Sequence, residues 1–170
     1  MYTRRQMLLA GGGLGLAVIA GGLLQKINAG PALIAEAEAA EHFEVSHTDA
    51  EWRTLLTAEQ YAILREQGTE RPYSSALNSE HRNGTFACAG CALPLYSSTT
   101  KFESHTGWPS FWQPLENAVA SHVDTSFGVE RKEIHCRRCG GHQGHVFDDG
   151  PAPTGLRYCM NGAAMTFTAA

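Results

Sequence analysis

The pattern of hydrophobic and polar residues divides this chain into three parts. An apolar, glycine-rich run without charge covers residues 7–24, and residues 32–44 are rich in Ala and Glu, with little periodicity. From about residue 49 onward the hydrophobic residues come in short groups. A capping-box sequence, Thr-Ala-Glu-Gln at 57–60, predicts one helix over about 58–67, with Gly68 placed to end it.

Beyond this helix the hydrophobic groups are rich in β-branched and aromatic residues, and turn signals such as Asn83-Gly84 separate them. This pattern is typical of short strands joined by tight turns. The expected strands cover residues 85–87, 119–123, 128–135, 157–158 and 165–167. We therefore predict a mainly β domain with antiparallel strands.

The N-terminal run resembles a twin-arginine export signal, because Arg4 and Arg5 come directly before it. We assign residues 1–30 to this signal, 31–48 to a linker and 49–170 to the folded domain. The run is at the short edge of what spans a bilayer, so an uncleaved membrane anchor is the second reading. A buried core helix is disfavoured by the two arginines. The expected location is the periplasm or another compartment reached by export.

Composition is that of an ordinary globular protein, with 43% hydrophobic and 18% charged residues. The formal net charge is -4, whereas nucleic-acid-binding domains usually carry a clear excess of Lys and Arg. We therefore expect no nucleic-acid partner, and contact with a membrane only through the N-terminal run.

The five cysteines divide into two C-x-x-C pairs and one single residue, Cys159. Two such pairs supply the four thiolates of a closed tetrahedral zinc site, which is structural rather than catalytic. Two disulfides, or one redox-active pair, are the competing readings. The predicted zinc ligands, one ion per chain, are Cys88, Cys91, Cys136 and Cys139.

The single cysteine lies in a strand-like segment in which Arg157, Cys159 and Asn161 share one face. An arginine beside the sulfur lowers the pKa of the thiol, and the amide of Asn161 can donate a hydrogen bond to an oxygen that develops nearby. The simpler reading is a buried, inert cysteine.

Two further groups of residues can surround such a thiol. His142 and His145 follow the second C-x-x-C pair directly and suit a general acid or base, although either can merely stabilise a turn. The aromatic sequence at 107–112, which includes Trp108 and Phe111, can line an apolar pocket for a substrate methyl group. Aromatic clusters of this kind are more often part of a core.

Taken together, these motifs over residues 52–167 resemble the methionine-R-sulfoxide reductase B family. The shared sequences are Gly-Thr-Glu-Arg-Pro at 68–72, the two C-x-x-C pairs, Gly-Trp-Pro-Ser-Phe at 107–111, the sequence from His142 to Pro151, and Arg-Tyr-Cys-Met-Asn at 157–161. The resemblance implies two antiparallel sheets with a few flanking helices, a zinc-knuckle site, and reduction of the R epimer of methionine sulfoxide in proteins or peptides.

The resemblance also implies a role for each site residue. Cys159 attacks the sulfoxide sulfur and becomes a sulfenic acid, while His142, His145 and Asn161 bind and protonate the sulfoxide oxygen. Arg157 and Asp149 tune the site, and Trp108 holds the substrate methyl group, with Phe111 beside it.

One position departs from the family pattern. Many members have a resolving cysteine two residues before the tryptophan, where this chain has Thr106. Because no other cysteine is spare, we expect an external thiol, of the thioredoxin-like kind, to reduce the sulfenic acid. Two other functions stay open: a zinc-ribbon interaction module in which Cys159 is inert, and a thiol peroxidase.

Overall fold

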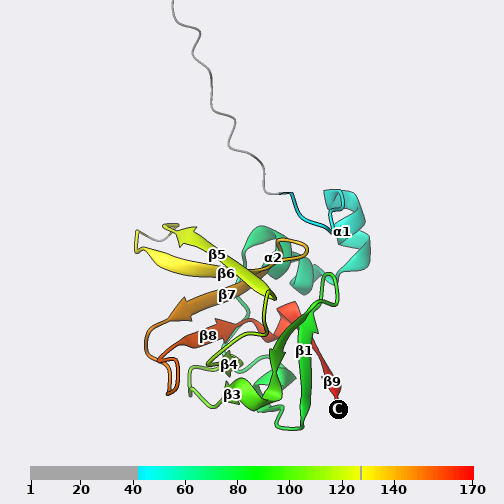
Figure 1. Cartoon of the computed structure of the whole chain (residues 1–170). Helices are drawn as coiled ribbons and strands as arrows, with labels where there is room; N and C mark the ends of the chain where they lie inside the picture. The colour runs from blue at the N-terminus through cyan, green and yellow to red at the C-terminus, as the bar shows by residue number, and fades with distance from the viewer. Residues whose placement is uncertain (1–41, 127) are drawn as a thin grey trace, which may run out of the picture. The chain divides into compact units, whose positions relative to one another are not determined.

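The computed structural model describes residues 42–126 and 128–170 (Figure 1). The predicted export signal at 1–30, and the linker up to residue 41, lie outside the described residues. Within the described part, no helix has the length and apolar composition needed to cross a bilayer. Phe43 and Val45, which the sequence assigned to the linker, contact the folded unit: the amide of Val45 donates to the carbonyl of Arg138 at 3.0 Å, and the Phe43 ring lies 5.9 Å from that of His135.

Two short α-helices come first. Helix α1 spans Asp49–Leu55 and α2 spans Ala58–Glu66, and each begins with a complete capping box, at Thr48 and Thr57. The predicted helix is thus confirmed, although it ends one residue early, because Gln67 adopts the left-handed conformation that terminates it. Helix α1 was not predicted, although its capping box has the same sequence signature. Three 3-10 turns lie at Ala76–Ser79 (η1), Ser98–Thr100 (η2) and Gly162–Ala164 (η3).

In residues 42–126 and 128–170, nine strands form two antiparallel sheets, which confirms the predicted fold class. The smaller sheet has the order β2-β1-β9 and the larger one β3-β4-β8-β7-β6-β5. Their bounds are β1 Gly84–Cys88, β2 Pro94–Ser97, β3 Lys101–Phe102, β4 Ser110–Phe111, β5 Val119–Asp124, β6 Arg131–Cys136, β7 His142–Phe147, β8 Arg157–Met160 and β9 Met165–Ala169. All five predicted strands are present, but the strand predicted at 128–135 begins later, at Arg131.

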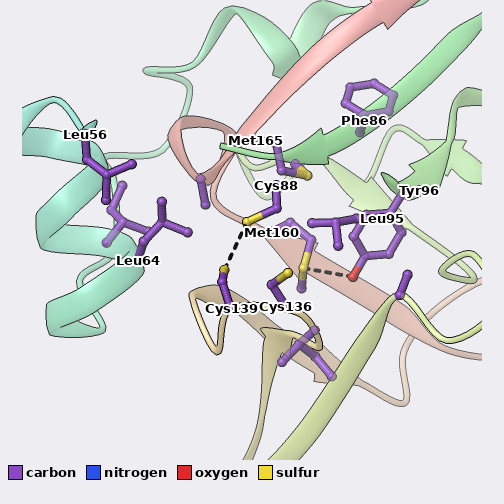
Figure 2. Packing of buried hydrophobic residues seen from close by; sticks show 14 of the residues in the cluster. Leu56, Leu64, Phe86, Cys88, Leu95, Tyr96, Cys136, Cys139, Met160 and Met165 are labelled. Carbon is purple, nitrogen blue, oxygen red and sulfur yellow. Dashed lines mark hydrogen bonds between the residues drawn. The ribbon is translucent and has the colours of Figure 1, made fainter. Parts of the chain in front are cut away.

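The core lies between the two sheets and α2. Leu64 of α2, Leu95, Tyr96, Met160 and Met165 are buried together there, and Figure 2 shows them surrounding three cysteine side chains. The hydroxyl of Tyr96 donates to the Met160 sulfur at 3.1 Å, so the buried phenol has a partner. The hydrophobic core and the cysteine cluster are therefore one continuous packing unit.

Candidate active site and metal centre

One row of polar and titratable side chains crosses the larger sheet. Residues that pair directly across strands point to the same face. Ser110 of β4 pairs with Cys159 of β8, Cys159 pairs with His145 of β7, His145 with Glu133 of β6, and Glu133 with His122 of β5. The strand register alone therefore lines up a thiol, a carboxylate and two imidazoles.

The thiol of Cys159 opens into a cavity of about 160 Å³. Its lining residues come from several elements and are Thr69, Trp108, Arg131, Gly144, His145, Phe147, Cys159 and Asn161. Gly144 allows β7 to approach β8 here, because a Cβ at this position would lie 2.1 Å from the carbonyl oxygen of Cys159 and its φ is +155°. Cys159 is thus half-buried and accessible from the cavity, which leaves the reading of a sealed, inert cysteine without support.

Arg157 and Asp149 lie beside this thiol. The guanidinium donates two hydrogen bonds of 2.8 Å to the Asp149 carboxylate and sits 4.5 Å from the centre of the Phe147 ring. Burial raises the pKa of Cys159, while the charge and hydrogen bonding of Arg157 lower it in part. The sequence argument considered only the arginine. In the structure the effect of burial is larger, so the pKa of the free thiol is raised rather than lowered.

The two histidines occupy different places. His145 lines the cavity, and its Nε2 lies 2.8 Å from a carboxylate oxygen of Asp124, which also accepts a 2.6 Å hydrogen bond from Arg131. Burial lowers the pKa of His145, and the bond to Asp124 opposes that shift. His142 is 2% exposed, does not line the cavity, and places its Nδ1 2.6 Å from Glu133. Its ring lies 5.4 Å from that of His145, so it supports His145 from behind.

Trp108 and Asn161 are held by one buried residue, Glu70. The Trp108 indole donates to the backbone carbonyl of Glu70 at 3.2 Å, and the Glu70 amide donates to the side-chain oxygen of Asn161 at 3.0 Å. The Glu70 carboxylate accepts two 2.7 Å hydrogen bonds from the amides of Gly162 and Ala163. Burial raises the pKa of this carboxyl, and the two amides oppose the rise. These contacts fix Trp108 and Asn161 at the cavity wall.

The predicted substrate contact of Phe111 is wrong. Its ring is fully buried, stacked 4.3 Å from Tyr96 and 5.0 Å from Phe86 in the core. The reason is the alternation of side chains along β4: Ser110 faces Cys159, so its neighbour must face the other way.

Hydroxyl groups replace a second thiol near Cys159. The Oγ1 of Thr106 lies 3.9 Å from the Cys159 sulfur, and a chain of hydrogen bonds continues from Thr106 to Ser104 at 2.8 Å and from Ser104 to Ser110 at 2.7 Å. Position 106, where the family resemblance places a resolving cysteine in many members, therefore presents a hydroxyl to the Cys159 sulfur.

The other four cysteines gather at one point, and their sulfurs all lie within 4.8 Å of one another. The sulfurs of Cys88 and Cys139 are 3.7 Å apart (Figure 2), and those of Cys91 and Cys136 are 3.4 Å apart. A disulfide bond is about 2.05 Å long. Thiolates held about 2.3 Å from a tetrahedral ion lie about 3.8 Å from each other. The donor set and its spacing fit a metal ion, and the four cysteines together can hold one.

Both C-x-x-C segments form the same turn. The amide of Ala92 donates to the carbonyl of Cys88 at 2.8 Å, and the amide of Gly140 donates to that of Cys136 at 2.9 Å. Ala92 and Gly140 both have positive φ, at 59° and 67°. Each turn folds a cysteine pair back on itself, so the two sulfurs of a pair converge on a single point.

Sequence reasoning missed the carboxylates that hold the histidines. Asp124 and Glu133 lie on β5 and β6, and Arg131 of β6 joins the cavity wall. Ser126, His145 and Arg131 hold the pKa of Asp124 well below its usual range. A signal was available: polar residues at alternate positions of both strands mark one polar face. Only the register shows which histidine each carboxylate meets.

Comparison with known proteins agrees with this geometry. The family model described as "SelR domain" matches residues 56–169 of this chain. A Leptospira interrogans protein named "Peptide methionine sulfoxide reductase MsrB" is 52% identical over 127 residues, covering 74% of this chain and 97% of the relative. Proteins of the same name from Thiobacillus denitrificans and Methanosarcina mazei are 54% and 48% identical, covering 71% and 74% of this chain and 92% and 90% of the relatives. The chain therefore belongs to the methionine-R-sulfoxide reductase B family.

Proposed function

We propose that this chain reduces methionine-R-sulfoxide in peptides or proteins to methionine, with Cys159 as the nucleophile. The observation that carries the proposal is the position of the Cys159 thiol on a cavity bounded by Trp108, Phe147 and His145. An aromatic wall suits the methyl and methylene groups of an oxidised methionine, and an imidazole suits its polar oxygen. The names of the relatives point to the same substrate class.

The reaction is an oxygen transfer from the substrate to the enzyme. The Cys159 thiolate attacks the sulfoxide sulfur, and the sulfoxide oxygen takes up a proton. The hydroxyl group then passes from the substrate sulfur to the sulfur of Cys159: the substrate S–O bond and the transient S–S bond break and a Cys159 S–O bond forms, so methionine leaves and Cys159 is left as a sulfenic acid. Sulfur of the substrate is reduced by two electrons, and sulfur of Cys159 is oxidised by two.

The neighbouring residues divide the remaining tasks. His145 and Asn161 bind the sulfoxide oxygen, and His145 delivers the proton because its imidazole is at the cavity wall. His142 acts as a positioning residue behind His145. Arg157, held by Asp149, favours the thiolate over the thiol. Trp108 packs against the substrate methyl group.

An epimer-resolved activity assay tests this proposal. Wild type and Cys159→Ser are compared on the R and S epimers of a methionine sulfoxide peptide and on hydrogen peroxide, with zinc quantified in each preparation. We expect turnover on the R epimer alone, complete loss in Cys159→Ser, and equal zinc in both. Faster turnover on peroxide would favour a thiol peroxidase, and activity retained in Cys159→Ser would favour an inert cysteine in a zinc-ribbon module.

We propose that an external thiol, of the thioredoxin-like kind, regenerates Cys159. Two thiols of the reductant convert the sulfenic acid to thiol and water and become a disulfide, which balances the two electrons. Support comes from Thr106, which lies beside Cys159 where a second thiol would be needed. Mass spectrometry after a single turnover without reductant should show a sulfenic acid at Cys159. A disulfide within the chain that includes Cys159 would contradict this route.

We propose zinc as the metal of the four-cysteine centre, one ion per chain, with a structural role. Four thiolates leave no open coordination position, so the ion would hold the chain and take no part in the reaction. Cys88, Cys136 and Cys139 are at most 2% exposed, which suits a closed site. Metal analysis of purified protein should give one zinc per chain, and Cys88→Ser should lose it together with the fold.

We propose export by the twin-arginine route, on the basis of Arg4, Arg5 and the apolar run at 7–24. Replacing both arginines by lysine should keep a tagged protein in the cytoplasm. Unchanged export of that variant would exclude this route.

A further inference from the structure

Three histidines surround one buried glutamate on the outer strands of the larger sheet. His122 of β5 pairs directly with Glu133 of β6, and His135 of β6 lies two residues beyond Glu133 on the same face and pairs with His142 of β7. The Nδ1 atoms of His122 and His135 lie 2.8 Å and 3.2 Å from Oε2 of Glu133, and Nδ1 of His142 lies 2.6 Å from Oε1.

The three imidazoles around this one carboxylate differ widely in their exposure to solvent. Glu133 is 3% exposed and His135 5%, whereas His122 is 49% exposed and borders solvent. A cavity of about 250 Å³ adjoins the cluster, and the Phe43 ring packs edge-on against His135 at its side. Nitrogen and oxygen donors from His122, Glu133 and His135 therefore line one pocket, with Glu133 and His135 buried and His122 reaching solvent.

We propose that His122, Glu133 and His135 bind a divalent first-row transition ion of the zinc class, at a site separate from the four cysteines. Two imidazoles and a carboxylate are a common ligand set for such ions, with water completing the coordination. Bonds of about 2.0–2.1 Å to a tetrahedral ion place its ligand atoms about 3.3 Å apart. The three donor atoms already lie within 4.8 Å of one another, so the largest movement needed is about 1.5 Å, which rotation of the half-exposed His122 side chain can supply.

The ion would also fix the second oxygen of Glu133. That oxygen holds Nδ1 of His142, whose ring contacts His145 at the cavity of Cys159. Groups that hydrogen-bond to metal ligands are oriented by the metal. Binding of the ion would thus restrict the movement of His142 and, through the ring contact, of His145. This consequence rests on the proposed reductase function, whereas binding of the ion does not.

The test uses the full chain carrying Cys159→Ser, because an active-site thiol beside His145 can itself bind added zinc. Protein purified with its structural zinc is dialysed against buffered Zn²⁺, and bound metal is then measured. We expect one zinc per chain beyond the structural ion. His122→Asn should weaken this second site at least tenfold, since even outer partners of metal ligands contribute about 10–100-fold in affinity. His81→Asn, at an exposed histidine outside the cluster, is the matched control.

Cobalt gives an independent reading of the ligands. Co²⁺ added to the same zinc-loaded protein should show ligand-field bands without the thiolate-to-metal charge-transfer absorption of a cysteine site. No additional bound metal, equal affinity in His122→Asn and wild type, or a thiolate signature on the added cobalt would each overturn the proposal.

Discussion

Removing the charge of Arg157 should raise the pKa of Cys159 and change its reactivity in two opposite ways. The guanidinium favours the thiolate through its charge and hydrogen bonding, against the effect of burial. With Arg157→Gln, only the hydrogen bond to Thr106 is left to oppose the effect of burial on the pKa of Cys159. The substitution should not endanger the fold, because Asp149, the partner left behind, is 60% exposed and can be hydrated.

The magnitude follows from the strength of the lost interaction. A hydrogen bond to a charged group contributes about 1.5–3 kcal/mol. Cys159 is only partly buried, so the lower end applies, which corresponds to about a tenfold smaller thiolate fraction at neutral pH. A thiolate of higher pKa is a better nucleophile, with a Brønsted coefficient of about 0.4–0.5. The rate of alkylation at pH 7 should therefore fall about three- to fourfold, while the plateau rate at high pH should rise about threefold.

The assay is the pH dependence of iodoacetamide alkylation at Cys159, followed by peptide mass spectrometry. Arg157→Lys keeps the charge and should show a smaller shift. Arg82→Gln breaks an exposed arginine–glutamate pair of similar geometry and should leave the profile of Cys159 unchanged. If Arg157→Gln leaves the midpoint unchanged or lowers it, the assignment of Arg157 as the group that favours the thiolate is refuted.

Three further predictions test other parts of the structure. Phe111→Leu should lower the free energy of unfolding by about 1–3 kcal/mol in denaturant titrations, because two aromatic pairs are lost, and should leave KM unchanged. A raised KM with unchanged stability would instead mean that Phe111 contacts the substrate. Burial raises the pKa of Glu133, but hydrogen bonds from His135 and His142 outweigh burial and hold this pKa at about 2, below its ordinary 4.5. Its contribution of about 3 kcal/mol is therefore complete above pH 4.5 and lost as the pH falls toward 2. The stability gap between wild type and Glu133→Gln in urea titrations should narrow below pH 4.5, and a gap independent of pH would contradict this. Thr106→Cys should convert the sulfenic acid at Cys159 into an internal disulfide after one turnover, visible as the loss of water in mass spectrometry; a persistent sulfenic acid would mean that the two positions cannot meet.

The sequence predicted helices and strands correctly where a short pattern is typical of only one kind of secondary structure. The capping box at Thr57 predicted α2, and short runs of β-branched and aromatic residues between turn signals predicted β1, β5 and β9. Strand β7 (His142–Phe147) was not predicted because its buried residues include the polar His142 and Gln143, so the sequence shows no alternation of hydrophobic and polar residues. Strands β3 and β4 have two residues each, too few to show any period.

The site shows the same division between local and distant information. The cysteine pairs are local turns, and their convergence follows from the preference of one ion for four sulfurs. The partners of the histidines are different, since Asp124 lies 21 residues from His145, and Glu133 lies 9 from His142. Which carboxylate meets which imidazole depends on strand register, and no residue type in isolation determines that register.

Hydrogen bonds of Gln143 link the four-cysteine centre to the candidate active site. Its side-chain amide donates to the sulfur of Cys88 at 3.5 Å, and its backbone carbonyl accepts hydrogen bonds from the amide of Asn161 at 2.8 Å and from the Asn161 side chain at 3.1 Å. Gln143 is fully buried, so it cannot exchange these partners for water. Cys139 and His142 are also separated by only two glycines in the chain. A metal ion that fixes the cysteine turns therefore fixes the start of β7, and with it the wall against which a substrate at Cys159 would rest. An ion bound by the four cysteines would take no part in the chemistry proposed for Cys159, yet the position of the Cys159 cavity wall would depend on that ion.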